Sequence, residues 1–492
     1  MKEFEALKPF LLKKRELRHL SSIVYYDMQT RAPMGGLEEE ADIWGGIDSQ
    51  YNEIVKSPEY IKAVKDFAFA PGKDVQLQRL ADLLLREVED TERLTIKQLE
   101  EWNKAIAESN SAWRQAKKTN DFQSWLPHFE KLVELKKGLL RLKKKDSHKT
   151  LYDVALDEYE PGETQEQLDA VFGPLKKTLL ELLPQVMKRQ ESADIPAVLP
   201  HSIDSQRHLT PELLKLINYD LNRGAIAESA HPFSDALGIN DARITTEYDV
   251  EDYHGNLSTV LHEGGHCIQF QNWPKSHYDH FLDNCATAAL CETHSRFYEN
   301  LLGKSRELVP YLLKLCREAF GEEFLAMTEE QFYQGENVVK PSLIRCDSDE
   351  LTYSLHIIIR YELERDLING DLEPKDLPKK WNEKYKQYLG VDVPSDSLGC
   401  MQDTHWSEAL FGYFPSYALG NLYGAQIMKT MEKDLDIKGL LAKGDLLPIR
   451  SWLAENDFAY DYLKPEDWIM KVTGEKLNPQ YFIDYLKNKF LA

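Results

Sequence analysis

Apolar positions in the first 190 residues recur at the three- and four-residue spacing of amphipathic helices. Leu77, Leu80, Leu84 and Val88, for example, form one stripe, with charged residues between them. Such a helix packs its apolar face against a core and presents its charged face to water. The pattern therefore predicts a helical N-terminal part over residues 1–190.

A different pattern occupies residues 195 to 255, where prolines and glycines are more frequent. The stretch from Arg243 to Val250 carries the β-branched and aromatic residues typical of a strand. We therefore expect a small antiparallel β-sheet here. Gly255 and Asn256 then break the strand pattern, and Asn256 is a favourable N-cap for a helix that starts there. Helical patterns continue from this point nearly to the C-terminus.

No internal repeat, low-complexity tract or linker divides the chain. An apolar fraction of 42% is enough for a sizeable core and argues against a disordered chain. We therefore expect a mainly α fold in a single domain that spans residues 1–492.

The charge of the chain limits its partners and its compartment. Sixty Lys and Arg residues against 82 Asp and Glu residues give a net charge of -22, which repels phosphate backbones and anionic lipids. No apolar run approaches the roughly 18 residues of a membrane-spanning helix, and the first residues lack the pattern of a secretory signal. The six cysteines contain no CxxC pair, and we interpret them as buried thiols. We expect a cytoplasmic protein without nucleic-acid or membrane partners.

The clearest chemical motif is an HExxH sequence, His262-Glu263-Gly264-Gly265-His266, at the start of the helical region that follows the predicted strand. With about 100° per residue, the two histidines are about 40° apart on a helix and can bind one metal ion. Glu263 lies one step further round the helix, where it is suited to hold a water molecule. The motif therefore predicts a metal site with Glu263 beside it.

Two adjacent glycines are unusual inside a helix. Each costs about 1 kcal/mol of helix stability relative to alanine. Gly264 and Gly265 therefore predict either empty space or the close approach of another backbone segment at this point.

A catalytic zinc ion takes three protein ligands and leaves a fourth position for water. The extended motif HExxHxxGxxH would place Gly at 269 and His at 272, but the chain has Gln269 and Asn272. The next predicted helix, from about Leu282 to Leu302, offers three candidates for the third ligand: Glu292, His294 and Glu299. A carboxylate is favoured because its charge offsets that of the metal, but spacing does not choose between the two glutamates.

Beyond the metal motif, four short motifs follow one another between about residues 228 and 426: His231-Pro232-Phe233, Asp241-Ala242-Arg243-Ile244-Thr245, Ile344-Arg345-Cys346-Asp347-Ser348-Asp349 and Gly399-Cys400-Met401-Gln402-Asp403-Thr404-His405-Trp406. With the HExxH sequence, they resemble the ordered signatures of the carboxypeptidase Taq family of thermostable metallocarboxypeptidases. The family's third metal ligand is the Glu of an HES/TQ element, which corresponds to Glu292 here. Cys291 and His294 replace the family's His and Gln, and Ser348 stands where the family usually has Ala.

The resemblance implies a metallocarboxypeptidase that removes C-terminal residues from peptides with a free C-terminus. It implies one zinc ion per chain, with cobalt as an alternative, held by His262, His266 and Glu292. Glu263 would be the general base. The expected fold is one helical body with a deep central groove, in which residues 191–492 form the catalytic part and the small sheet lies next to the HExxH helix. Family members are commonly homodimers.

An exopeptidase must also recognise the C-terminal carboxylate, for which a guanidinium is the best partner. The resemblance points to Arg345, with Arg243 as the second candidate. The oxyanion of the reaction needs a further donor besides the metal. Four residues qualify, and the sequence does not rank them: His231, His405, Tyr413 and Tyr417.

Two other functions fit the same motifs. A helical metallo-oligopeptidase would cut internally and would also cleave a peptide whose C-terminus is an amide. An inactive scaffold would bind peptides in its groove without a metal. Cleavage products and metal dependence distinguish the three.

Overall fold

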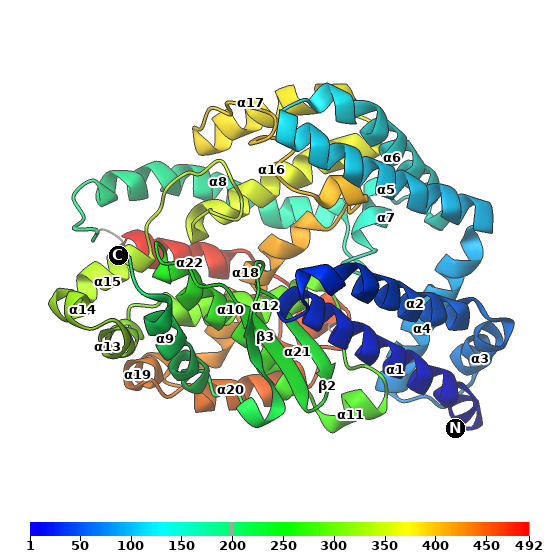
Figure 1. Ribbon diagram of the computed structural model, residues 1–492, viewed down its shortest axis with the longest axis horizontal. Coiled ribbons are helices and arrows are strands. Elements are labelled where there is room, and N and C mark those ends of the chain that lie inside the picture. Colours follow the sequence, from blue (N-terminus) through cyan, green and yellow to red (C-terminus); the bar gives the residue numbers. More distant parts are fainter. Residues whose placement is uncertain (197–199, 285, 492) are drawn as a thin grey trace.

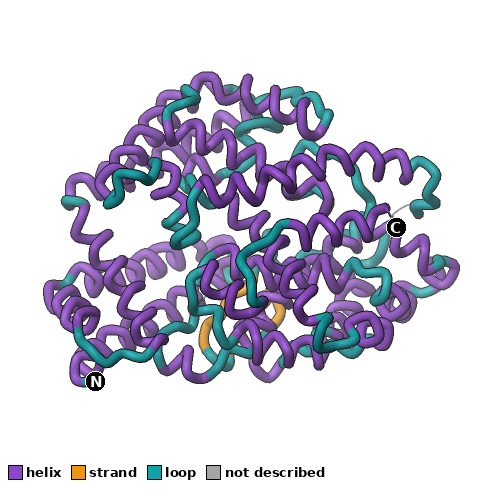
Figure 2. Tube along the Cα trace, turned by 180° about the vertical axis from the view of Figure 1, so that it is seen from behind, coloured by secondary structure: helices purple, strands orange, loops and turns teal. Residues whose placement is uncertain are grey.

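Helices form most of the chain in the computed structural model, which describes residues 1–196, 200–284 and 286–491 (Figure 1). A single small patch of strands lies among the helices (Figure 2). The expected mainly α fold is therefore confirmed. The deep central groove stays a prediction.

The N-terminal helices pack around a small core of their own. They are α1 (Lys2–Thr30), α2 (Leu37–Lys56), α3 (Pro58–Phe69) and α4 (Val75–Arg93). Leu80, Leu84 and Val88 of the predicted stripe are buried there. Leu282, from the loop after α11 (Lys275–Asp279), belongs to the same cluster and joins these helices to the rest of the molecule.

The remaining helices share one large core that extends to the C-terminus. Helix α16 is the most enclosed of those near the site, because every residue from 351 to 364 is buried. Helices α10 and α12 are described below with the site. Apart from α11, the other helices from α5 to α22 have these bounds: α5 (Ile96–Thr119), α6 (Phe122–Lys143), α7 (Leu151–Leu156), α8 (Gln165–Gln190), α9 (Ile203–Leu216), α13 (Val309–Phe320), α14 (Glu322–Ala326), α15 (Glu329–Glu336), α16 (Glu350–Asn369), α17 (Leu377–Leu389), α18 (Phe414–Met431), α19 (Ile437–Lys443), α20 (Leu447–Leu453), α21 (Pro465–Thr473) and α22 (Gln480–Leu491).

The sheet has three strands, β1 (Ile226–Glu228), β2 (Ser234–Gly238) and β3 (Asp241–Thr246), in the order β1-β3-β2. Strand β2 pairs with β3 in antiparallel fashion, but β1 pairs with β3 in parallel, with Ile226 opposite Ile244. The expectation of an antiparallel sheet is therefore wrong for one of the two pairs. The chain reverses once between β1 and β2 and again between β2 and β3, so the first and third strands run the same way. The expected strand over residues 243–250 already ends at Thr246.

Helix α10 (Tyr253–Gln271) carries the HExxH motif and follows the sheet directly. Its N-cap is Asp252, whose side chain accepts the backbone N–H of His254 at 3.0 Å, so the prediction of Asn256 as the cap is wrong. Asn256 is buried in the first turn instead, and its side-chain amide donates to the hydroxyl of Thr246 at 3.0 Å. This hydrogen bond ties the start of α10 to the end of β3.

One helix, α12 (Ala288–Arg296), covers the HExxH helix from the other side. It begins at the N-cap Thr287 and continues as a π-helical segment, Phe297–Gly303. The predicted helix from Leu282 to Leu302 therefore starts six residues later than expected. Helix α12 packs against α10 on one side and α18 on the other, which places its side chains over the HExxH motif.

Candidate metal centre

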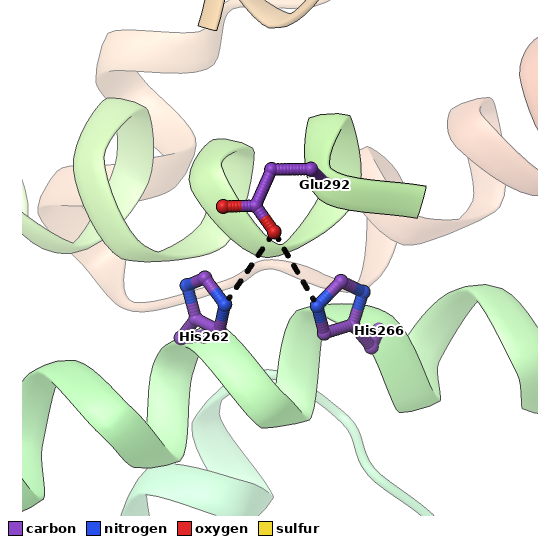
Figure 3. Close-up of side chains that lie close together, drawn as sticks. All are labelled: His262, His266 and Glu292. Atoms are coloured by element: carbon purple, nitrogen blue, oxygen red, sulfur yellow. Dashed lines mark ion pairs between the residues drawn. The ribbon is translucent and has the colours of Figure 1, made fainter. Parts of the chain in front are cut away.

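His262 and His266 of α10 and Glu292 of α12 point toward one another (Figure 3). Oε2 of Glu292 lies 3.8 Å from Nε2 of His262 and 3.9 Å from Nε2 of His266, and the three donor atoms lie within 4.8 Å of one another. In tetrahedral coordination with metal–ligand distances of about 2.0 to 2.1 Å, the ligand atoms lie about 3.3 to 3.5 Å from one another. For the three side chains to hold one small divalent ion, the two distances to Glu292 must therefore shorten by about half an ångström, and the separation of the two histidine nitrogens by up to about 1.4 Å.

The two glycines of the motif explain how the helices come so close. A Cβ atom on Gly265 would lie 2.6 Å from the carbonyl oxygen of His294, and one on Gly264 would strike the side chain of Ile217 in the turn after α9. On the far side of α12, a Cβ on Gly420 of α18 would lie 3.0 Å from the carbonyl carbon of Glu292. Close backbone approach, one of the two expectations for the glycine pair, is therefore confirmed.

The structure separates the three candidates for the third ligand. Glu292 faces the two histidines, whereas Glu299, in the π-helical segment, accepts a hydrogen bond from Nδ1 of His262 at 2.9 Å. His294 points away from them and pairs with Asp457 at 3.0 Å. Glu299 follows Glu292 by seven residues, which is about two helical turns. The sequence spacing therefore indicates that both glutamates lie on the same face of the helix. A carboxylate behind a metal-binding histidine fixes its tautomer and orientation.

His266 has a different partner at its second nitrogen. Its Nδ1 lies 3.3 Å from Sγ of Cys291, the residue that replaces the family's His. Burial lowers the pKa of His266, but the neighbouring Cys291, Glu263 and Glu292 outweigh burial and raise it to about 9. A metal ion must therefore displace a proton from His266 at neutral pH.

Glu263 is 8% exposed and lies between the two histidines along α10. Among the described residues, no hydrogen bond or ion pair engages its carboxylate. Its negative charge also contributes to the raised pKa of His266. Its acceptor capacity is therefore free for a water molecule beside the metal position.

Arg345 lies in a buried ion network with Asp403 and Arg360. Its Nε and Nη2 donate to Oδ1 of Asp403 at 3.1 and 2.9 Å, while Arg360 pairs with the other oxygen of Asp403. Burial raises the pKa of Asp403, but the two guanidinium groups outweigh it and hold the pKa well below its ordinary value. Nη1 of Arg345 is directed at the hydroxyl of Tyr353, 3.5 Å away.

His405, Tyr413 and Tyr417 form one aromatic cluster next to this network. Nε2 of His405 lies 3.3 Å from the hydroxyl of Tyr417, and the guanidinium of Arg345 lies 5.0 Å from the ring of Tyr417. Burial, together with the two arginines of the network, lowers the pKa of His405 to about 4, although Asp403 opposes them. His405 is therefore neutral at pH 7. Burial also raises the pKa of Tyr413; its hydrogen bond with Tyr417 opposes this effect, and the charges of Glu292 and Cys291 add to it.

The two remaining predicted residues lie elsewhere. Arg243 on β3 is paired with Asp241 at 2.7 Å and lies over the ring of Tyr26 of α1. His231 is exposed in the loop between β1 and β2. No hydrogen bond, ion pair or ring contact within the described part of the chain joins the side chain of either residue to the three metal-binding side chains.

Two residues near the centre were not identified from the sequence: Arg296, which contacts Glu292, and Tyr353, which contacts Arg296. Nε of Arg296 donates to Oε1 of Glu292 at 2.8 Å, and its guanidinium lies 4.4 Å from the ring centroid of Tyr353. Arg296 is four residues after Glu292, a spacing at which side chains meet on a helix. The position of Tyr353 on α16 has no such local signal.

A helical fold in which the two histidines of an HExxH helix and a glutamate from a second helix converge on one position defines a metallopeptidase. Comparison with known proteins agrees: the model of the Carboxypeptidase Taq (M32) metallopeptidase family matches residues 7–490. The chain belongs to this family, which confirms the resemblance seen in the sequence. A peptide hydrolase that depends on a divalent metal follows from this membership.

Similar proteins cover the chain from end to end. Carboxypeptidase 1 of Bacillus subtilis is 34% identical over 98% of this chain and 97% of its own. Thermostable carboxypeptidase 1 of Thermus thermophilus is 32% identical over 99% of this chain and 98% of its own. The solved structure of Trypanosoma cruzi metallocarboxypeptidase 1 is 29% identical, covers all of both chains and superposes with a TM-score of 0.95. Within the described residues, no helix is long and apolar enough to cross a membrane.

Proposed function

We propose that this protein is a zinc carboxypeptidase that releases single residues from the free C-terminus of peptides. The observation that carries the proposal is the convergence of Nε2 of His262, Nε2 of His266 and Oε2 of Glu292 within 4.8 Å. Three protein ligands leave a fourth position for water or substrate. Cobalt can take the same ligand set.

A divalent metal at this position supplies Lewis acidity and makes a water molecule more acidic. Glu263 accepts the proton of that water as its oxygen forms a bond to the scissile carbonyl carbon. When the C–N bond breaks, Glu263 returns the proton to the leaving amine. Its carboxylate suits this role because no described residue pairs with it.

Arg345 is our first candidate for binding the substrate's C-terminal carboxylate. Asp403 engages one side of its guanidinium, and Nη1 remains directed at Tyr353. A guanidinium held in this way is already oriented before substrate arrives, which lowers the entropic cost of binding. Arg243, whose Nε and Nη2 are engaged by Asp241 in the same way, remains the second candidate.

The oxyanion requires a donor in addition to the metal. The aromatic cluster beside Arg345 offers three candidates: His405, Tyr413 and Tyr417. His405 is neutral, so one ring nitrogen carries a proton that can be donated. The tyrosines keep their protons because their pKa values are raised. His231 is the weakest candidate, since it is exposed.

The assembly and compartment belong to the same proposal. We expect a homodimer in the cytoplasm, in which each chain forms one domain and binds one ion. The contact of Leu282 with the N-terminal helices supports the single domain.

The decisive experiment compares a peptide with a free C-terminus and its C-terminal amide, incubated with metal-loaded protein and analysed by mass spectrometry. We expect stepwise loss of residues from the free peptide only, and none after chelation. Internal cuts in both peptides would instead identify an endopeptidase. Binding without any cleavage would favour the scaffold.

The general base is tested with Glu263→Gln, which keeps the shape of the side chain but removes its basicity. We expect unchanged metal content by elemental analysis and a loss of kcat of about 100-fold or more. Glu251→Gln, an exposed acid just before α10, is the matched control and should keep full activity. A Glu263→Gln variant with the wild-type rate would exclude Glu263 as the base.

A further inference from the structure

Two carboxylates share one cation beside the metal position. Arg296 donates from Nε to Oε1 of Glu292 at 2.8 Å and from Nη1 to Oε2 of Glu299 at 3.1 Å. The first carboxylate is the expected third metal ligand, and the second holds His262 at 2.9 Å. Arg296 therefore contacts the metal ligand and the partner of another metal ligand at the same time.

The two oxygens of Glu292 have different surroundings. Oε2 faces both histidines and also accepts the hydroxyl of Ser295 at 3.2 Å, whereas Oε1 is engaged by Arg296. An oxygen that already accepts a charged hydrogen bond is less available to a metal. This arrangement favours binding of the ion through Oε2 alone.

We infer that Arg296 is a positioning residue of the metal centre, which directs one oxygen of Glu292 toward the ion and holds Glu299 behind His262. The inference rests on the proposed function and adds to it a residue that touches neither the ion nor the substrate. A guanidinium suits the task because it offers donors in two directions in one plane.

The packing of Arg296 supports a fixed position for its side chain. Its side chain is 18% exposed, and those of Glu292 and Glu299 are 12% and 11% exposed. The guanidinium also lies against the ring of Tyr353, 4.4 Å from its centroid. Ion pairs on open surfaces contribute little, but here both partners are largely shielded from water.

The charges lead to the same conclusion. Glu292 and Glu299 carry like charges on one face of the same helical segment, and Lys304 reaches only Glu299, at 3.7 Å. Without Arg296, repulsion would separate the two carboxylates, and Glu292 could bind the ion with either or both oxygens. Metal affinity and coordination should therefore both change.

The test measures zinc affinity by competition with a chromophoric chelator for Arg296→Met, Arg296→Lys and the wild type. We expect the Met variant to bind zinc about 10- to 100-fold more weakly, as for other residues that support metal ligands. The Lys variant, which restores charge but reaches only one carboxylate, should fall between them. The absorption spectrum of the cobalt-loaded Met variant should shift from four-coordinate toward five-coordinate character.

Arg306→Met is the matched control. Arg306 also pairs with a glutamate, Glu330, and lies 3.9 Å from the ring centroid of Tyr333, but away from the metal centre. The zinc affinity of the Arg306→Met variant should stay within about twofold of the wild type. Circular dichroism checks the fold of each variant. If the Met variant does not fold, Arg296→Gln, whose side chain is a neutral donor, replaces it. The Gln variant should also bind zinc at least 10-fold more weakly than the wild type.

The outcomes separate this inference from the proposed function. Wild-type zinc affinity and an unchanged cobalt spectrum in a folded variant that lacks the guanidinium would overturn the role of Arg296, while the carboxypeptidase proposal would stand. Absence of zinc binding or of exopeptidase activity in the wild type would overturn the proposed function itself. Equal losses in the Arg296 and Arg306 variants would also overturn the inference, because the effect would then be general.

Discussion

Replacement of Gly265 by alanine tests whether the contact between α10 and α12 sets the metal geometry. The added Cβ would lie 2.6 Å from the carbonyl oxygen of His294 and 2.9 Å from Cα of Ser295. Both are backbone atoms, so no rotamer change relieves the clash. An ordinary contact needs about 3.4 Å, so α12 must move away by about 0.5 to 0.8 Å.

A shift of this size exceeds the roughly 0.2 Å by which metal–ligand distances vary. Overpacking costs about 1 to 3 kcal/mol, while alanine regains about 1 kcal/mol of helix propensity. The protein should therefore still fold, with a free energy of unfolding lower by about 0 to 2 kcal/mol. Because Glu292 moves with α12, we expect at least 10-fold weaker zinc binding.

Gly264→Ala provides the control at the neighbouring position. Its Cβ would meet the end of the Ile217 side chain, which can rotate, and the next nearest atoms are 3.8 and 3.9 Å away. Zinc titration should give an affinity within about twofold of the wild type for this variant. Equal zinc affinities for the Gly264 and Gly265 variants would refute the argument from helix contact.

Two further predictions concern buried acids. Burial raises the pKa of Glu160 to about 7 from an ordinary 4.5, so the folded chain keeps a proton that the unfolded chain loses as the pH rises through this window. The resulting loss in the free energy of unfolding is about 3 kcal/mol at pH 8. In urea denaturation, Glu160→Gln should therefore recover much of this loss at pH 8 but not at pH 4. Equal effects of the substitution at both pH values would contradict this prediction. Asp403→Asn leaves Arg345 and Arg360 buried without a carboxylate and should lower the free energy of unfolding by about 3 to 5 kcal/mol; a loss below about 1 kcal/mol would show that the network is not a coupled charge cluster.

The fold class and the meeting of His262 and His266 on one helix face could be predicted because they depend on local periodicity. The stripe that contains Leu80 and Leu84 forms within one helix, and the geometry that brings His262 and His266 together needs only one turn. Neither feature requires knowledge of distant segments. For the same reason, the glycine pair indicated a close approach before the approaching segment was known.

Predictions that depended on boundaries or on strand direction were less accurate. Asn256 has the right chemistry for an N-cap, but Asp252 lies earlier and takes the position, while the Asn256 side chain bonds to β3. The direction of β1 depends on how many times the chain reverses before β3. Composition carries no information about such reversals.

The sequence by itself determined a helical metallopeptidase with an HExxH helix, because helical spacing and ligand chemistry are written in neighbouring residues. Helical spacing left Glu292 and Glu299 open, because both acids lie on one face of one helical segment, and the resemblance to the family pointed to Glu292. Only the tertiary structure showed that Glu292 faces the two histidines while Glu299 accepts a hydrogen bond from His262. The same holds for Tyr353, which reaches Arg296 and Arg345 from a different helix. Contacts between segments far apart in the chain depend on how the helices pack, and packing is a property of the whole fold.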